Sequence, residues 1–354
     1  MKLDRVKQIA EALLYEGYML YPYRPSSVKN QQRWNFGVLY PPSWCDPQFG
    51  SDRSSMQTEC LLKTDSSTRL TVKVRFLHIV ERSIAKLAFP NSELPETREP
   101  ALEFVDRLEL TGRVYQPWQE AVERELSYDD LDPVDFATMS PLLFSFPEGS
   151  SIEYLRNEQG EAIGAIVRAW KAINGSVEIR SLSCHDDVVR ITVQIENLTD
   201  TNPTIVFGSA SRDKVLLHSL VSAHTILGAE NGEFLSLLET PAGFEDSVAH
   251  CQNLGTWPVL ATDNADAMLS SPIILYDHPQ IAPESAGNLF DSTEIDEILS
   301  LRILTLTDEE KREMRQSDDR TRGILERTEN MPEEQFMKLH GILRGLTPSK
   351  EEMQ

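Results

Sequence analysis

The side chains best suited to chemistry in this sequence, its histidines and cysteines, are scattered along the chain. Seven histidines and four cysteines occur among 354 residues, and no C-x-x-C pair is present. A zinc site needs about four convergent ligands, which usually come in short-spaced pairs. The pairs Cys184-His185 and His250-Cys251 offer one ligand each on a strand, because neighbouring side chains point to opposite faces. The spacing favours free, mostly buried thiols and hydrogen-bonded core histidines.

A site assembled from distant segments is the alternative that this spacing leaves open. Its candidate members are His218, His224, Cys251 and His278. The first two lie six residues apart, which is not the i,i+4 spacing of one helix face. The sequence lacks the phosphate-binding loop, the dinucleotide fingerprint, the zinc-protease motif and the nucleophile elbow. We therefore predict no catalytic residue, no metal ligand and no cofactor, and an enzyme is the less favoured class.

An aromatic and basic segment near the N-terminus is the strongest candidate binding site in the sequence. Its members are Tyr21, Tyr23, Arg24, Lys29, Arg33 and Trp34. Residues 1–40 carry six Lys or Arg against three acidic residues, a net charge of +3, which leaves about −25 for the remainder. Aromatic rings beside cations can stack on bases or hold an anionic ligand. The competing interpretation is a packed connector whose cations pair with the acidic remainder.

The charge and hydropathy of the whole chain argue against several classes of function. A net charge of −22 disfavours nonspecific binding to nucleic acid or anionic lipid, because such binding requires a basic surface. No apolar run approaches the roughly 18 residues of a transmembrane helix, and the first residues lack the apolar stretch of a signal peptide. We expect a cytoplasmic protein that does not insert into a membrane and whose partner is another protein.

Hydrophobic periodicity predicts a β-rich body that would position these side chains. Residues 3–16 have the apolar spacing of an amphipathic helix. Residues 69–80 alternate strictly, which predicts a strand with His78 on its apolar face. Further expected elements are strands at 36–40 and 102–114, and loops rich in Pro and acidic residues at 90–100 and 128–148.

An antiparallel meander is predicted between residues 162 and 196. Its strands are 162–173, 177–184 and 188–196, and Asn174-Gly175 is typical of a two-residue hairpin turn. Asn231-Gly232 predicts a second such turn. The remaining expectations in this region are an element at 215–227 that fits helix or strand, a strand at 233–238, a short helix at 241–253, and strands at 257–261 and 272–276.

The C-terminal stretch is predicted to be helical. Helices are expected over 294–304 and from Thr307 to about residue 327, and a third starts near Met331. Thr307 and Glu310 form the pattern of a capping box. The second helix is unusually polar, and such a helix either bridges solvent or is marginal alone.

These elements together predict the α+β class, with an antiparallel β-sheet core, an N-terminal helix and a helical C-terminal arm. The expected divisions are a β-rich domain with the N-terminal helix over 1–200, a mixed region packed on it over 201–290, and the arm over 291–354. The length of 354 residues is sufficient for two domains, or for one domain with an appendage.

Two runs of residues carry a family resemblance. The first comprises Tyr15-Glu16-Gly17-Tyr18, residues 20–24, Lys29-Asn30 and residues 33–37. The second comprises residues 269–285 and continues through 287–291, 293–299 and 306–311. The runs resemble an uncharacterised bacterial protein family associated with gene clusters of NiFe uptake hydrogenases. The resemblance covers most of the chain and implies a shared pathway, but it brings no activity and no site residues with it.

Two functions remain in view from the sequence. The first is a non-enzymatic accessory, assembly or interaction protein, with hydrogenase subunits or maturation factors as the implied partners. The alternative is an enzyme or a protein that binds a small ligand or metal at a site assembled from distant residues, with Asp277-His278 beside Glu284 and the pair His218 and His224 as its best motivation. Binding of single-stranded nucleic acid through the N-terminal aromatic residues is least favoured, because the net charge is −22.

Overall fold

Long-range strand pairing organises this chain, as a computed structural model shows. The structure describes residues 3–14, 35–45, 50, 52–91, 101–134, 141–185, 187–201, 212–279, 303, 305–315 and 319–330. The chain forms two units: the first comprises residues 1–20 and 25–279, and the second comprises residues 21–24 and 280–354. Within the described ranges, every helix is too short or too polar to span a bilayer.

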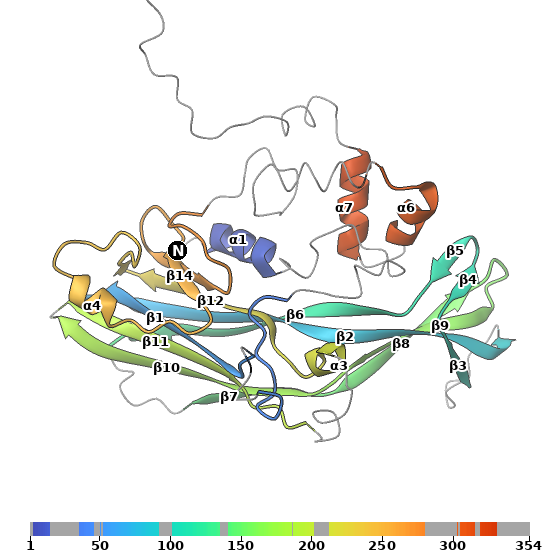
Figure 1. Cartoon of the computed structure of the whole chain (residues 1–354), viewed down its shortest axis with the longest axis horizontal. Coiled ribbons are helices and arrows are strands. Elements are labelled where there is room, and N and C mark those ends of the chain that lie inside the picture. Colours follow the sequence, from blue (N-terminus) through green and yellow to red (C-terminus); the bar gives the residue numbers. More distant parts are fainter. Residues whose placement is uncertain are drawn as a thin grey trace, which may run out of the picture. The chain divides into compact units, whose positions relative to one another are not determined.

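The described part of the first unit is built from two large antiparallel sheets and one small two-stranded sheet (Figure 1). One sheet has the order β13 (Glu233–Phe234), β1 (Ser55–Lys63), β11 (Val188–Asn197), β10 (Ile173–His185) and β7 (Leu142–Phe146). The other has the order β14 (Trp257–Leu260), β15 (Ala267–Ser271), β12 (Val221–Glu230), β2 (Arg69–Asn91), β9 (Ala162–Trp170) and β8 (Gly149–Arg156). Its strand β2 also pairs with β3 (Leu102–Val105) and β6 (Trp118–Leu131). These pairings confirm the predicted antiparallel sheet core.

The two sheets bury a common apolar core between them. Leu70, Val72, Val74 and Phe76 of β2 point into it and are fully buried. They meet alternate residues of the first sheet, including Met56, Cys60, Leu62, Ile179, Ile191 and Ile195. The predicted strand over 69–80 is therefore confirmed, and β2 continues to Asn91 for 23 residues in all.

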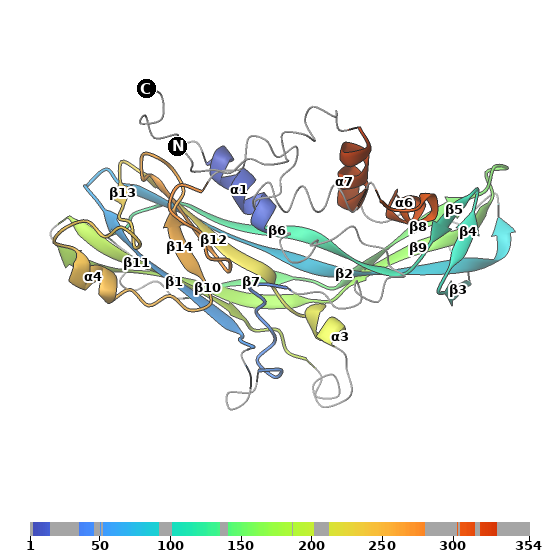
Figure 2. The same ribbon diagram turned by 45° about the horizontal axis from the view of Figure 1, so that its top comes forward.

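The opposite face of β2 is covered by α1 (Asp4–Leu14), which packs against β12 and β15 (Figures 1 and 2). The buried side chains of this helix are Val6, Ile9, Ala10 and Leu14. The amphipathic helix expected at the N-terminus is confirmed. Because both faces of β2 are covered, its polar-looking face is buried as well, and Arg75 is only 5% exposed.

The core-facing side of β2 changes character along its length. Phe76 belongs to the core between the sheets, His78, Val80 and Arg82 follow on the same face, and Ile84 begins a second apolar cluster. A hairpin of β4 (Leu108–Leu110) and β5 (Arg113–Tyr115) contributes its leucines to that second cluster. The strand thus carries two buried polar side chains, His78 and Arg82, between two apolar clusters.

The hairpin predicted at Asn174-Gly175 is wrong. Both residues lie inside β10, and Gly175 is not among the glycines with positive φ. A Cβ added to Gly175 would lie 2.3 Å from Cζ of Phe144, so the glycine gives room to a neighbouring ring. The strands on either side, β9 and β10, belong to different sheets. The pairing of β10 with β11 follows the prediction.

Two further predictions between residues 102 and 148 need correction. The strand expected over 102–114 is divided into β3, β4 and β5, with a tight turn at Thr111 and Gly112, whose φ values are 48° and 75°. The acidic loop expected at 128–148 begins inside β6 and later contains β7. Acidic side chains did not prevent strand formation in β6 because many of them are exposed or paired with cations of neighbouring strands.

Several short elements also differ from their predicted form. Residues 36–40 do not form the expected strand and contain only an isolated bridge at Leu39. Residues 272–276 do not form the expected strand either; the strand in this region is β15, which ends at Ser271. Asn231 does turn, with φ of 55°, but it joins β12 to β13 of the other sheet. The segment at 215–227, which fitted helix or strand, contains the end of a short helix, α3 (Arg212–Leu216), followed by the strand β12.

The helix expected over 241–253 is shorter than predicted and comprises only α4 (Glu245–Ala249). The strand expected over 257–261 is confirmed as β14.

The second unit contains two short helices in its described part, α6 (Asp308–Arg315) and α7 (Asp319–Glu329). The predicted capping box is confirmed, because Glu310 accepts from the Thr307 amide at 2.5 Å and Thr307 Oγ1 accepts from the Glu310 amide at 3.3 Å. The prediction of a single long helix here is wrong, because α6 and α7 are separate helices whose residues Met314 and Leu325 pack together with Ile303.

A continuous helical arm is not supported. The helices expected over 294–304 and beyond Met331 lie outside the described residues, apart from Ile303. The division at residues 200 and 290 stays a prediction.

Candidate functional site

The six binding residues proposed from the sequence lie outside the described part of the chain. These are Tyr21, Tyr23, Arg24, Lys29, Arg33 and Trp34. Their role stays a prediction.

The four residues of the alternative hypothesis lie in separate surroundings. His224 is buried on β12 beside Arg75 of β2, and Cys251 follows α4. His278 is 42% exposed in its side chain, with its Nδ1 3.9 Å from a carboxylate oxygen of Asp263. In the residues that the structure describes, no group of three or more His, Cys, Asp or Glu side chains is arranged to hold a metal ion.

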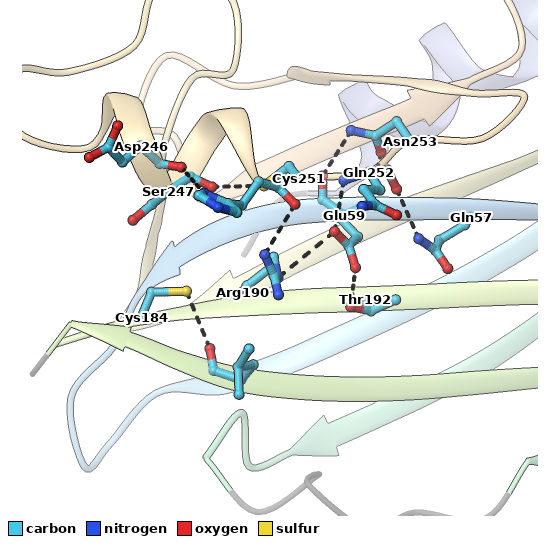
Figure 3. A network of polar contacts seen from close by, with 12 residues as sticks. Gln57, Glu59, Cys184, Arg190, Thr192, Asp246, Ser247, Cys251, Gln252 and Asn253 are labelled. Atoms are coloured by element: carbon cyan, nitrogen blue, oxygen red, sulfur yellow. Dashed lines mark hydrogen bonds and ion pairs between the residues drawn. The ribbon is translucent and has the colours of Figure 1, made fainter.

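A polar network around Glu59 fastens the segment after α4 to the outer face of β1 (Figure 3). One carboxylate oxygen of Glu59 accepts from Thr192 Oγ1 at 3.0 Å, and the other accepts from the Gln252 amide at 2.7 Å. Asn253 bonds both backbone groups of Glu59, and Arg190 donates to the His250 carbonyl at 3.1 Å. The network satisfies the buried Glu59 carboxylate and the buried Thr192 hydroxyl.

The thiols near this clamp are poor nucleophiles. Burial, reinforced by the Glu59 carboxylate, raises the pKa of Cys251 to about 11. Burial also raises the pKa of Cys60, which is fully enclosed in the core. A thiol reacts through its thiolate, and raised pKa values keep that form scarce at neutral pH. The four cysteines are free, although Cys45, Cys184 and Cys251 are only half-buried.

His78 is the centre of a second arrangement, which five separate segments build. Its Nε2 lies 2.9 Å from the Lys171 carbonyl oxygen, and its Nδ1 lies 3.4 Å from Nε of Arg124. Because a carbonyl only accepts, Nε2 carries the proton and Nδ1 accepts from the guanidinium. The Arg124 guanidinium also lies over the Phe146 ring, 4.7 Å from its centroid. The prediction of a hydrogen-bonded core histidine is confirmed.

Most of the charged groups that act on His78 and His218 are positively charged. Burial lowers the pKa of His78 to about 4, and the charges of Arg124 and His218 act in the same direction. The pKa of His218 is also lowered, first by burial and then by Lys171, whereas Glu148 acts oppositely. His218 and His78 thus influence each other electrostatically, although 140 residues separate them in the sequence.

Further along the same face of β2, Arg82 shares the acidic partner Glu120 with Arg168 of the neighbouring strand β9. Arg82 pairs with Glu120 at 3.3 Å, and Arg168 pairs with Glu120 at 2.7 Å and with Glu153 at 2.8 Å. Arg82 is nearly buried, so its paired carboxylate is needed to hold the charge in the interior. These cations are compensated, in contrast to Arg124.

A third feature is a segment after β15 that holds large apolar side chains in solvent. Ile274 is 72% exposed and Tyr276 is 88% exposed. The Asp277 carboxylate accepts from the Leu260 amide at 2.7 Å and from Ser236 Oγ, and the His278 amide donates to the Leu260 carbonyl at 2.7 Å. At the other end, Ser271 Oγ donates to the Ile273 carbonyl at 2.7 Å. Both ends of this short segment are fixed.

Gly37 and Pro272, one from each of the two runs that carried the family resemblance, lie side by side. A Cβ on Gly37, in the first run, would lie 2.6 Å from Cβ of Pro272, in the second. Gly37 has φ of 57°, and its carbonyl accepts from the Ala223 amide at 2.9 Å. Sequence reasoning missed Arg124, Lys171 and the exposure of Ile274 and Tyr276. The one available sequence signal for the close approach at Gly37 was the glycine itself, because glycine often marks places where two backbones lie close together.

Comparisons of the chain with protein-family models and with curated proteins found no match.

Proposed function

We propose that this protein is a non-enzymatic accessory protein that docks onto a protein partner through its exposed 272–276 segment. The observation that carries the proposal is the rigid presentation of Ile274 and Tyr276 to solvent. Large apolar side chains in such positions are typical of interaction sites, and aromatic residues dominate binding energy at interfaces. A segment fixed at both ends loses little conformational entropy on binding.

The chemistry of the segment indicates the kind of surface that it fits. Asp263 is 78% exposed in its side chain and lies beside His278, and the exposed Glu239 donates its amide to the Ser236 hydroxyl that holds Asp277. The whole chain carries a net charge of −22. We therefore expect a partner with an apolar pocket for the two side chains and a basic rim. The resemblance suggests a NiFe hydrogenase subunit or maturation factor as that partner.

A pull-down with matched variants tests the docking surface. The tagged full chain is produced in a strain that makes the hydrogenase, and hydrogenase subunits and maturation factors in the eluate are quantified by mass spectrometry. We expect the double variant Ile274→Ser/Tyr276→Ser to lose the partner, because truncation of a hot-spot residue costs about 2 kcal/mol or more. The control is Leu143→Ser, which removes a side chain that is 77% exposed on β7.

The possible outcomes test the docking surface and the identity of the partner separately. Thermal unfolding should be unchanged in both variants, because the altered side chains are exposed. Equal loss of partner in the Leu143→Ser control would contradict the assigned surface. Recovery of no hydrogenase component by the unaltered protein, together with normal hydrogen uptake in a deletion strain, would overturn the proposed function.

A further inference from the structure

Two asparagine–glycine pairs in this chain share a local sequence but have different surroundings. They are Asn174-Gly175 and Asn231-Gly232. Such pairs are chemically labile, because the glycine amide nitrogen can attack the asparagine side chain and no Cβ on the glycine obstructs that approach. Asparagine is for this reason counted among the thermolabile residues. In the folded protein, tertiary contacts decide which of the two pairs reacts.

The first pair is held on every side. The Asn174 amide donates to Thr199 Oγ1 at 3.0 Å, and the Asn174 side-chain oxygen accepts from Ser145 Oγ at 2.8 Å. Gly175 is buried and pairs with residues of both β7 and β11. Attack at Asn174 therefore requires these contacts between strands to open first.

The second pair lies in the exposed turn between β12 and β13. The Asn231 side chain is exposed, and its amide makes one long hydrogen bond, 3.4 Å, to the Ser67 carbonyl. Among the described residues, none accepts from the Gly232 amide. The nucleophile and the group that it attacks are therefore both accessible to solvent.

We propose that Asn231 is a site of spontaneous covalent modification, at which the side-chain amide becomes a carboxylate through a succinimide ring. The Gly232 amide gives its proton to hydroxide, and its nitrogen then forms a bond to Cγ of Asn231. The bond from Cγ to Nδ2 breaks, and ammonia leaves with a proton from water, which regenerates the hydroxide. Water opens the ring at either carbonyl and gives aspartate or isoaspartate, so one water is consumed for each ammonia released.

The hydroxyl of Thr68 restrains this reaction. It donates to the Asn231 carbonyl at 2.6 Å, and it accepts from the Asp65 amide at 2.8 Å. The Thr68 side chain is buried, so its position is fixed. Attack requires the peptide between Asn231 and Gly232 to rotate toward the asparagine side chain, and this rotation breaks the bond from Thr68. Thr68 is thus a positioning residue that slows the modification.

The modification alters the connection between the two large sheets. Strand β12 belongs to one of them and β13 to the other, and Phe234 of β13 is buried in the common core. Isoaspartate lengthens the main chain at this connection, and both products add a negative charge. The site is distinct from the 272–276 docking segment and does not depend on the proposed hydrogenase partner.

Peptide mass spectrometry of the full chain, sampled during incubation at pH 8, tests the site. We expect conversion at Asn231 to be about tenfold or more faster than at Asn174, because paired strands open far less often than exposed turns. In urea the two rates should agree within about threefold, because unfolding removes the contacts that protect Asn174. The unaltered protein carries this comparison, so no variant has to fold for it.

Two variants locate the chemistry. Asn231→Gln should abolish conversion at this position and leave Asn174 unchanged, because the longer side chain has to close a larger ring. Thr68→Val should speed conversion at Asn231 by about two- to tenfold, because it removes one hydrogen bond to the turn. Equal rates at Asn231 and Asn174 in the folded chain, or no conversion at Asn231, would overturn the proposal. An unchanged rate in Thr68→Val would refute the restraint by Thr68.

Discussion

The ring of Phe144 on β7 fills the space that a side chain at Gly175 of β10 would need: a Cβ on the glycine would lie 2.3 Å from Cζ of the phenylalanine. The two residues are directly paired across antiparallel strands. Phe144 in turn contacts Phe76 of β2, with ring centroids 6.1 Å apart. The missing side chain of Gly175 therefore lets an aromatic ring bridge the first sheet and the core.

The first prediction follows from this contact. Gly175→Ala should lower the free energy of unfolding by about 1–3 kcal/mol, because the methyl group overpacks against Phe144 and the Glu196 carbonyl. Chemical denaturation monitored by circular dichroism measures the change. Gly323→Ala is the matched control, since no atom lies within 4 Å of its added Cβ, and it should stabilise α7 by up to about 1 kcal/mol. An unchanged midpoint for Gly175→Ala would refute the packing argument.

The second prediction concerns pH. His78 and His224 are buried and have pKa values of about 4 in the folded protein against 6.5 when exposed. The unfolded chain binds more protons between these values, so stability is full above pH 6.5 and falls as the pH is lowered toward 4. Each histidine contributes about 3 kcal/mol to this loss at most.

Thermal unfolding between pH 7 and pH 4 tests this dependence. His224→Gln should flatten the decline, because it removes one of the two buried imidazoles. Leu143→Ser, which alters an exposed side chain that does not titrate, should leave the slope unchanged. A slope that His224→Gln does not alter would argue against the buried neutral state.

The third prediction addresses the clamp at Glu59. Glu59→Ala removes the acceptor of Thr192 and of the Gln252 amide and should cost about 1–3 kcal/mol. The segment after α4 then opens more often, so Cys251 should react faster with iodoacetamide, as peptide mass spectrometry would measure. Glu233→Ala, which alters an exposed pair with Lys63 at 3.8 Å, is the control. Equal labelling rates in the two variants would show that Glu59 does not hold this segment.

The fourth prediction concerns the capping box of α6. Thr307→Ala should destabilise this helix by about 1 kcal/mol, because the Glu310 amide loses its acceptor. Thr307→Ser should retain the stability, since it keeps the hydroxyl oxygen. Hydrogen exchange of the Glu310 amide measures the difference, and equal protection in the alanine and serine variants would contradict the role of the cap.

The sequence by itself determined those elements whose signals are local. Alternation in residues 69–80, the apolar stripe of α1 and the Thr307–Glu310 pattern each depend on neighbours within a few positions. The burial of His78 on the core-facing side also follows from alternation alone. These signals specified an antiparallel core and the ends of several elements.

Tertiary structure decided which strands pair and where charges gather. Asn174-Gly175 has the local pattern of a turn, yet the ring of Phe144 and the pairing with β7 keep it extended. Arg124 and the Lys171 carbonyl meet at His78 only because β2, β6 and the end of β9 converge there. Pairing energy of this kind depends on contacts between residues far apart in the chain, which no local pattern encodes.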